Sequence, residues 1–125
     1  RYDEAITFCS SNPAKPCYGG GDLNARTKSK SPENSPFMRS SIDATSTTRG
    51  NRLLELWGDC RMSILNGSPY DTAGCAVWTS YQAMGKSVID YMFALNSGLQ
   101  FVKSFTVQPK NGWSDHCATT LRLDI

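Results

Sequence analysis

The chain has 125 residues, of which 13 are Lys or Arg and 11 are Asp or Glu, so its formal net charge is only +2. This balance alone indicates neither a nucleic-acid nor a membrane partner, and no run of about 18 apolar residues is present to span a bilayer. The length suits a single domain. Because the chain starts at Arg1, without an initiator Met, and ends in the alternating run Leu121–Ile125, which reads as a strand cut at its edge, we expect residues 1–125 to be a fragment or an excised domain.

The cysteines point to reduced thiols. Their number is odd and none forms a C-x-x-C pair, which disfavours both a zinc ribbon and a disulfide scaffold. We therefore expect an intracellular protein in which several thiols are buried as small apolar side chains. The cysteines are Cys9, Cys17, Cys60, Cys75 and Cys117.

The first half of the chain predicts a helix end, a strand end and a long loop. Asp3–Cys9 has the apolar spacing of a short amphipathic helix, which the following prolines stop. Gly19–Gly21 permits a sharp turn or a close backbone approach, which would place Asp22 and Asn24 at a strand end. Residues 27–48 are rich in Ser, Thr, Pro and Asn and predict a long surface loop.

Charge is concentrated around that loop. Between Arg26 and Arg52 there are six basic residues against two acidic ones, Glu33 and Asp43. Such a segment could meet phosphates, and it could equally be a solvated, mobile loop.

The second half alternates a helix with short strands, which predicts an α+β fold. The helix shows a near-helical period of apolar residues, and the strands show alternation or β-branched runs. We expect a helix at Asn51–Cys60 and strands at Met62–Leu65, Ala76–Tyr81, Val88–Leu95, Leu99–Val107 and Ala118–Leu123.

Asp90 is the anomaly in this pattern, because it lies inside an apolar strand. An unpaired buried carboxylate is costly, so Asp90 needs a partner. The only histidine of the chain, His116, can supply one. A carboxylate that accepts a hydrogen bond from the imidazole fixes its tautomer and favours its charged form. A cationic His116 would stabilise a phosphorane-like transition state by hydrogen-bonding a non-bridging oxygen.

Three further residues fit the same chemistry. Asp22 could orient or deprotonate a water molecule, and Asn24 could donate to a phosphate without adding charge. Asp115 offers a hard oxygen ligand of the kind that Mg2+ prefers. Spacing alone does not show that these residues meet, and an isolated Ser-Asp-His triplet is also common in ordinary surface loops.

The motifs Gly-Asp-Leu-Asn (Gly21–Asn24), Ile-Asp-Tyr (Ile89–Tyr91) and Ser-Asp-His (Ser114–His116) resemble, in this order, the last three motifs of the endonuclease/exonuclease/phosphatase superfamily. Asn51–Leu54 and Leu65–Gly67 resemble the family's intervening helix and strand. The resemblance covers nearly all of the chain. It implies the C-terminal half of a DNase I-like two-sheet β-sandwich with flanking helices.

The resemblance also implies roles for matching residues. Asp22 resembles the aspartate that positions the attacking water, Asn24 the asparagine that contacts the phosphate, and Asp90 the carboxylate paired with the catalytic histidine, His116. Asp115 resembles the acid associated with the metal, Mg2+ or Mn2+. We expect Asn24, Arg26 and His116 to contact substrate.

The departure from the family lies in its N-terminal half. That half normally carries an early asparagine and the glutamate that is the main Mg2+ ligand, whereas the only glutamates here are Glu4, Glu33 and Glu55. None sits in a suitable strand before Gly-Asp-Leu-Asn. We therefore expect an uncovered apolar sheet face, and an isolated chain that is poorly active, self-associates or needs the missing half as its partner.

The resemblance implies a metal-dependent phosphodiester hydrolase without fixing its substrate. The basic loop and the cysteine pattern favour nucleic acid over a lipid or sugar phosphate. The contexts Gly-Asp-Leu-Asn-Ala-Arg and Ser-Asp-His-Cys-Ala-Thr resemble endonuclease domains of retrotransposon polyproteins, which nick DNA and would act in the nucleus. Two alternatives remain: an inactive remnant or binding module, and a phosphatase of a small phosphorylated substrate.

Overall fold

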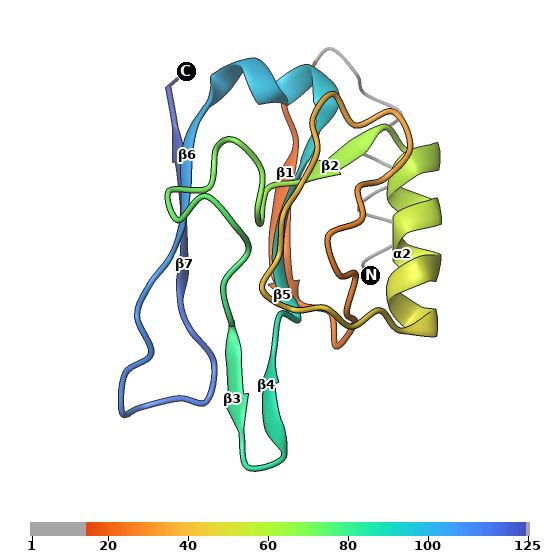
Figure 1. The fold of residues 1–125 in the computed structure, drawn as a ribbon. Helices are drawn as coiled ribbons and strands as arrows, with labels where there is room; N and C mark the ends of the chain where they lie inside the picture. Colours follow the sequence, from red (N-terminus) through yellow and green to blue (C-terminus); the bar gives the residue numbers. More distant parts are fainter. Residues whose placement is uncertain (1–14, 125) are drawn as a thin grey trace.

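A computed structural model of the chain describes residues 15–124. Its centre is a three-stranded antiparallel sheet in the order β1-β5-β2, with β1 at Tyr18–Asp22, β5 at Asp90–Leu95 and β2 at Met62–Ile64. The sheet stands between helix α2 (Thr48–Asp59) on one side and a ribbon of β6 (Val102–Val107) and β7 (Thr119–Leu123) on the other (Figure 1). The described chain is therefore built in three layers around two small cores.

The first core lies between α2 and the sheet. Alternate residues of a strand face opposite sides, and in β5 the residues Tyr91, Phe93 and Leu95 face the helix. They pack with Trp57, whose ring centroid lies 6.0 Å from that of Tyr91. The side chain of Thr47 caps the helix by accepting a hydrogen bond from the amide of Gly50.

The second core lies on the opposite face of the sheet. The intervening residue of β5, Ala94, packs there with Leu65, Leu99 and Phe105. Phe105 belongs to β6, and Leu99 to the 3-10 helix η1 (Asn96–Phe101). Because described residues cover both faces of the central sheet, the expected uncovered apolar face is not found there.

A separate hairpin projects from the body of the molecule. It consists of β3 (Ser80–Gln82) and β4 (Gly85–Ser87), which pair antiparallel and extend below the sheet in Figure 1. The backbone of Thr79 bonds to the carbonyl of Ser87 at the base of the hairpin.

The element predictions hold with shifted boundaries. The helix begins at Thr48, because Thr47 supplies the cap. The predicted strand at 76–81 is reduced to Ser80–Gln82, since Ala76 instead bonds to the loop residues Ser40 and Ile42. The predicted strand at 99–107 is wrong over residues 99–101, which belong to η1, and correct from Val102 onward. The helix predicted at Asp3–Cys9 lies outside the described residues.

Residues 27–47 form the predicted long loop, but this loop is not simply a solvated segment. Asp43 is only 1% exposed and Arg39 only 6%. Arg39 donates hydrogen bonds to the carbonyl of Asn66 and the hydroxyl of Thr27, and burial lowers its pKa to about 10. The charged residues of the loop therefore help to attach it to the core.

Two general expectations can be compared with the described residues. Cys17, Cys60, Cys75 and Cys117 are free thiols, and Cys9 lies outside the described range. Among the described residues, no helix has the length and apolar character that a membrane span requires.

Candidate active site

Two carboxylates face each other where β1 ends and β5 begins. In the antiparallel register, Asp22 lies directly opposite Asp90. The strands can approach here because β1 is rich in glycine: a Cβ on Gly20 would lie 2.8 Å from the carbonyl oxygen of Tyr91. Like charges directly across a sheet repel each other, so this pair favours a cation between the two carboxylates.

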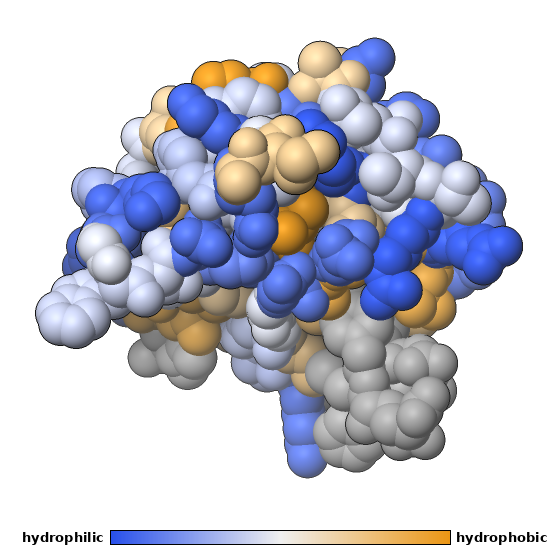
Figure 2. All heavy atoms as spheres, turned by 90° about the horizontal axis from the view of Figure 1, so that it is seen from below, coloured by the Kyte–Doolittle hydropathy of each residue, from blue (hydrophilic) through white to orange (hydrophobic). Residues whose placement is uncertain are grey.

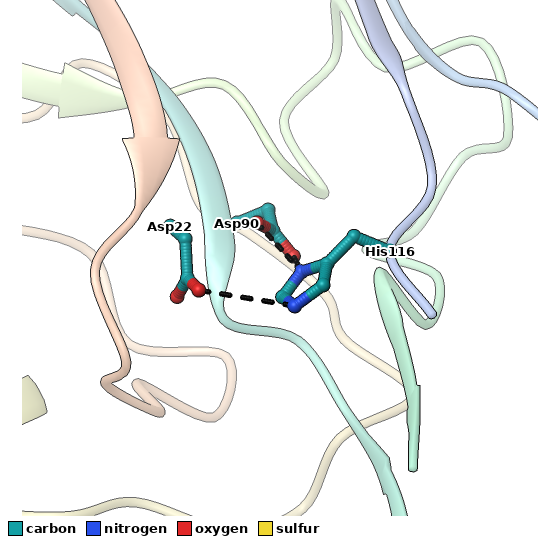
Figure 3. Close-up of side chains that lie close together, drawn as sticks. All are labelled: Asp22, Asp90 and His116. Atoms are coloured by element: carbon teal, nitrogen blue, oxygen red, sulfur yellow. Dashed lines mark hydrogen bonds and ion pairs between the residues drawn. The ribbon is translucent and has the colours of Figure 1, made fainter. Parts of the chain in front are cut away.

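His116, from a distant part of the sequence, can supply this cation. Its segment runs beside β3: His116 forms a bridge with Ser80, the amide of Tyr81 donates to the carbonyl of Asp115, and the amide of Cys117 donates to the carbonyl of Thr79. These backbone bonds place the imidazole at the edge of the central sheet, beside Asp22 and Asp90 (Figure 3).

The imidazole has one nitrogen bound and one left open. His116 Nδ1 lies 2.8 Å from Oδ2 and 3.1 Å from Oδ1 of Asp90. Its Nε2 lies 3.8 Å from Oδ2 of Asp22, which is within ion-pair range but too long for a good hydrogen bond. Nε2 and the Asp22 carboxylate can therefore both contact an oxygen atom that enters between them.

The electrostatics favour the protonated imidazole. The hydrogen bond to Asp90 is the largest cause that raises the pKa of His116 above its ordinary value, and the charges of Asp90, Asp22 and Asp115 raise it further. Burial opposes this only in part, since the side chain is 33% exposed. His116 is thus prepared to act as a cation that donates from Nε2.

Thr79 holds the two halves of the site together. It is fully buried, and its hydroxyl accepts hydrogen bonds from the amides of Ile89 (3.0 Å) and Asp90 (3.1 Å). Its carbonyl accepts the amide of Cys117, next to the histidine. Sequence reasoning missed Thr79, because nothing in a Trp-Thr-Ser triplet signals that one hydroxyl bridges two distant segments.

Asn66 is the second supporting residue that sequence reasoning missed in this role. Its side-chain amide donates to the carbonyl of Asp90 at 2.9 Å, and its side-chain oxygen accepts the amide of Met92 at 3.0 Å. In the sequence, Asn66 lies within Leu65–Gly67, which resembles a strand segment of the family, and the pattern predicts no role for its side chain. The fully buried side chain of Asn66 thus helps to fix the start of β5, where it bonds the carbonyl of Asp90 while Thr79 bonds the amide of the same residue.

Asn24 follows Asp22 in an exposed turn. Its φ of 48° lies in the left-handed region, which Asn tolerates better than most residues. Its amide donates to Oδ1 of Asp22 at 2.9 Å, which leaves Oδ2 of Asp22 directed toward His116. The predicted proximity of Asp22 and Asn24 therefore has a defined geometry.

Two predicted site residues, Asp115 and Arg26, lie outside the cluster of Asp22, Asp90 and His116. Asp115 is exposed and is outside the cluster that Asp22, Asp90 and His116 form, although its charge contributes to the raised pKa of His116. Arg26 turns its guanidinium to Asp43, with bonds of 2.9 Å from Nε and 2.8 Å from Nη2. The roles of both residues in binding metal or substrate stay predictions.

The side chains of Asp22, Asp90 and His116 can be compared with the ligands that a divalent cation prefers. One ligand atom from each of Asp22, Asp90 and His116 lies within 4.8 Å of the others. Carboxylate oxygens suit Mg2+, whereas an imidazole nitrogen is not a ligand it prefers. The carboxylates fit the metal, and the imidazole, already bonded to Asp90, does not.

Comparison with known proteins supports the fold. No protein-family model and no curated protein sequence matches the chain. A solved structure does: the endonuclease domain of TRAS1, a telomere-specific non-LTR retrotransposon, superposes with a TM-score of 0.65 at 21% sequence identity. The chain shares the fold of that domain. The DNase I-like α+β fold and the resemblance to retrotransposon-type domains predicted from the motifs are thereby confirmed at the level of fold.

The match covers 99% of this chain but only 51% of the TRAS1 chain. The present chain therefore spans about half the length of the domain that it resembles. That it is the C-terminal half, and that the other half carries a metal-binding glutamate, stay predictions.

Proposed function

We propose that this chain supplies the C-terminal half of a Mg2+-dependent endonuclease domain that hydrolyses phosphodiester bonds of DNA. The observation that supports this most strongly is the placement of His116, which is bonded through Nδ1 to Asp90 and keeps Nε2 open beside Asp22. The same arrangement leaves a cation and a carboxylate facing one point, which is what hydrolysis of an anionic ester requires.

Each residue has a role in the proposed reaction. Asp22 takes a proton from the attacking water as the new bond to phosphorus forms and the bond to the leaving oxygen breaks. His116, kept protonated by Asp90, donates from Nε2 to a non-bridging oxygen, where negative charge increases in the transition state. Asn24 donates to the phosphate from the exposed turn that follows Asp22.

Asp90 is bonded to His116, and Asp22 is assigned to the attacking water. The proposed Mg2+ would therefore be held by the exposed carboxylate of Asp115 together with ligands from the other half of the domain. When bound, a divalent ion neutralises charge on the phosphate and on the leaving oxygen. This assignment keeps the imidazole free for its role with the substrate, in agreement with the donor chemistry of the site.

DNA is the preferred substrate class for two reasons. The structural neighbour is an endonuclease domain, and the site lies at a strand end where, among the described residues, Asn24 and Asp115 are exposed. A catalytically inactive remnant is the second candidate, because the chain matches only 51% of that neighbour.

A plasmid-nicking assay tests the proposal. The chain is produced together with the segment encoded upstream of Arg1 and incubated with supercoiled plasmid and Mg2+ or Mn2+. We expect nicking that EDTA abolishes and that His116→Ala lowers by about 100-fold or more. Lys103→Ala, an exposed change on β6, is the matched control and should leave the rate unchanged.

Two outcomes would count against this function. If His116→Ala nicks DNA as fast as the unchanged protein, the enzyme proposal fails at its central residue. If the unchanged protein binds DNA but shows no cleavage with either metal, the inactive binding module is favoured. We also expect the 125-residue chain alone to be poorly active, and robust nicking by it would contradict the need for a second half.

A further inference from the structure

The first turn of α2 is attached to the segment that carries Asp22 and Asn24. The amide of Thr47 donates to the carbonyl of Arg26 at 2.9 Å, and the amide of Arg26 donates to the hydroxyl of Thr47 at 3.1 Å. Gly50 makes this contact possible, because a Cβ there would lie 2.0 Å from the carbonyl oxygen of Arg26. The start of the helix is therefore bonded to the segment that follows Asp22 and Asn24.

Arg49 projects from this first turn to the residue between Asp22 and Asn24. Its Nε donates to the carbonyl of Leu23 at 2.7 Å. On the other side of the same residue, the amide of Leu23 donates to the carbonyl of Ile89 at 3.0 Å. Leu23 is thus held on two sides, by Arg49 of the helix and by Ile89 of the segment that leads into β5. The residues on either side of Leu23 in the sequence, Asp22 and Asn24, are both candidate site residues.

The rest of the Arg49 guanidinium is available. A guanidinium carries five N–H donors, and among the described residues the structure gives the Nη1 and Nη2 atoms of Arg49 no partner. The side chain is exposed. Figure 2 shows that hydrophilic residues cover much of the face seen from below.

The charges of the site create a need for such a cation. Three carboxylates, those of Asp22, Asp90 and Asp115, act on His116, and they also repel an approaching phosphodiester. His116 bonds to Asp90 through Nδ1 and lies within ion-pair range of Asp22 through Nε2, so one cation faces three carboxylates. An arginine beside Leu23 adds a fixed positive charge and donors of the shape that phosphate oxygens accept in pairs.

We propose that Arg49 binds a backbone phosphate of the substrate strand through its free guanidinium nitrogens while its Nε holds the turn that positions Asp22 and Asn24. This inference rests on the proposed function, since it assigns a binding residue to the same site. Arg49 differs from Arg26, whose guanidinium is occupied by Asp43.

Three variants of the protein used in the nicking assay separate the two roles. Arg49→Gln removes the charge. Arg49→Lys keeps the charge but cannot bond Leu23 and phosphate with one planar group. Arg52→Gln is the control: Arg52 is exposed on the same helix, three residues farther along it, and the bond to the carbonyl of Leu23 comes from Arg49 instead.

Binding is measured first, with fluorescently labelled duplex DNA in EDTA, so that cleavage plays no part. We expect Arg49→Gln to weaken binding about ten-fold at low salt. The slope of log affinity against log salt concentration should fall in magnitude by about 0.9, the value for one phosphate contact. Arg49→Lys should keep the slope, and Arg52→Gln should keep both the affinity and the slope.

Nicking kinetics then test the positioning role. Arg49→Lys should lower kcat about ten-fold with little change in KM, because Leu23 loses its donor while the charge remains. A folded Arg49→Gln protein with the salt slope of the unchanged protein would overturn the phosphate contact. An unchanged kcat in Arg49→Lys would overturn the positioning role.

The outcomes distinguish this inference from the proposed function. If His116→Ala abolishes nicking while Arg49→Gln binds DNA like the unchanged protein, only the inference fails. If Arg49→Gln changes the salt slope but His116→Ala nicks normally, the phosphate contact stands and the proposed active site fails.

Discussion

Two carboxylate–cation pairs lie in different regions of this chain, and their surroundings differ in kind. In the loop of residues 27–47, Asp43 bonds Arg26 through both oxygens and also accepts the amides of Val88 and Thr45, at 2.9 and 3.0 Å. Its side chain is 2% exposed. At the sheet end, Asp90 bonds a single ring nitrogen of His116, which is 33% exposed and keeps Nε2 open.

The difference shows which pair supports the fold and which is free to react. Every oxygen of Asp43 is satisfied from within the chain, so this carboxylate fastens the long loop to the residues before β5. Asp90 also fixes its partner, but the partner retains a donor that points outward. A pair that is closed on itself contributes stability, whereas a pair with one open nitrogen can meet a substrate.

The largest expected effect is on the closed pair. Asp43→Ala should lower the free energy of unfolding by about 3 kcal/mol or more, because it leaves the buried amide of Val88 without an acceptor and Arg26 without its partner. Asp43→Asn keeps the shape and should cost less. Chemical denaturation of both variants measures the difference, and equal stabilities for Asp43→Ala and the unchanged chain would contradict this role.

The same pair has a defined pH dependence. Burial by itself raises the pKa of Asp43, but hydrogen bonds from Arg26, Val88 and Thr45 outweigh burial and lower it. A lowered pKa in the folded state means that the stabilisation is present above the ordinary pKa of an aspartate. It is lost as the pH falls through the lowered value.

A smaller effect is expected at Thr79, which connects the site to the fold. Thr79→Val keeps the shape but removes the acceptor for the amides of Ile89 and Asp90. We expect a loss of about 2 kcal/mol in the free energy of unfolding and a misplaced Asp90. Thr79→Ser retains the hydroxyl and is the control. If Val and Ser variants have the same stability, the hydroxyl has no such role.

The sequence predicted the residues of the candidate site better than the buried polar residues that hold the surrounding segments in place. Asp22, Asp90 and His116 were recognised because their motifs occur in a characteristic order, and the structure brings these side chains together. The helix and most strands followed from apolar periodicity. The burial of Asp43 and Arg39 did not, because a polar, proline-containing segment carries no periodic signal for buried charges.

Thr79 and Arg49 show the same limit. Each acts through a hydrogen bond to the backbone of a residue distant in sequence, Thr79 to Asp90 and Arg49 to Leu23. Such contacts depend on which segments the fold places side by side. No local pattern of residue types encodes them.

The central claim, that Asp90 holds His116 as the cation of the site, can be tested by titration. His116 is the only histidine of the chain, so NMR can follow its ring signals without assignment ambiguity. We expect its pKa to lie above the ordinary histidine value of about 6.5 and to fall in Asp90→Asn, since the bond to Asp90 is the main cause of the rise.

A raised pKa in the folded state also sets the direction of two linked properties. The stabilisation from the Asp90–His116 pair is fully present below the unfolded-state pKa and is lost as the pH rises through the folded-state value. Nicking that depends on cationic His116 should decline over the same range. The account predicts a histidine titration above the ordinary value that Asp90→Asn shifts downward. The same pKa in Asp90→Asn and in the unchanged chain would contradict it.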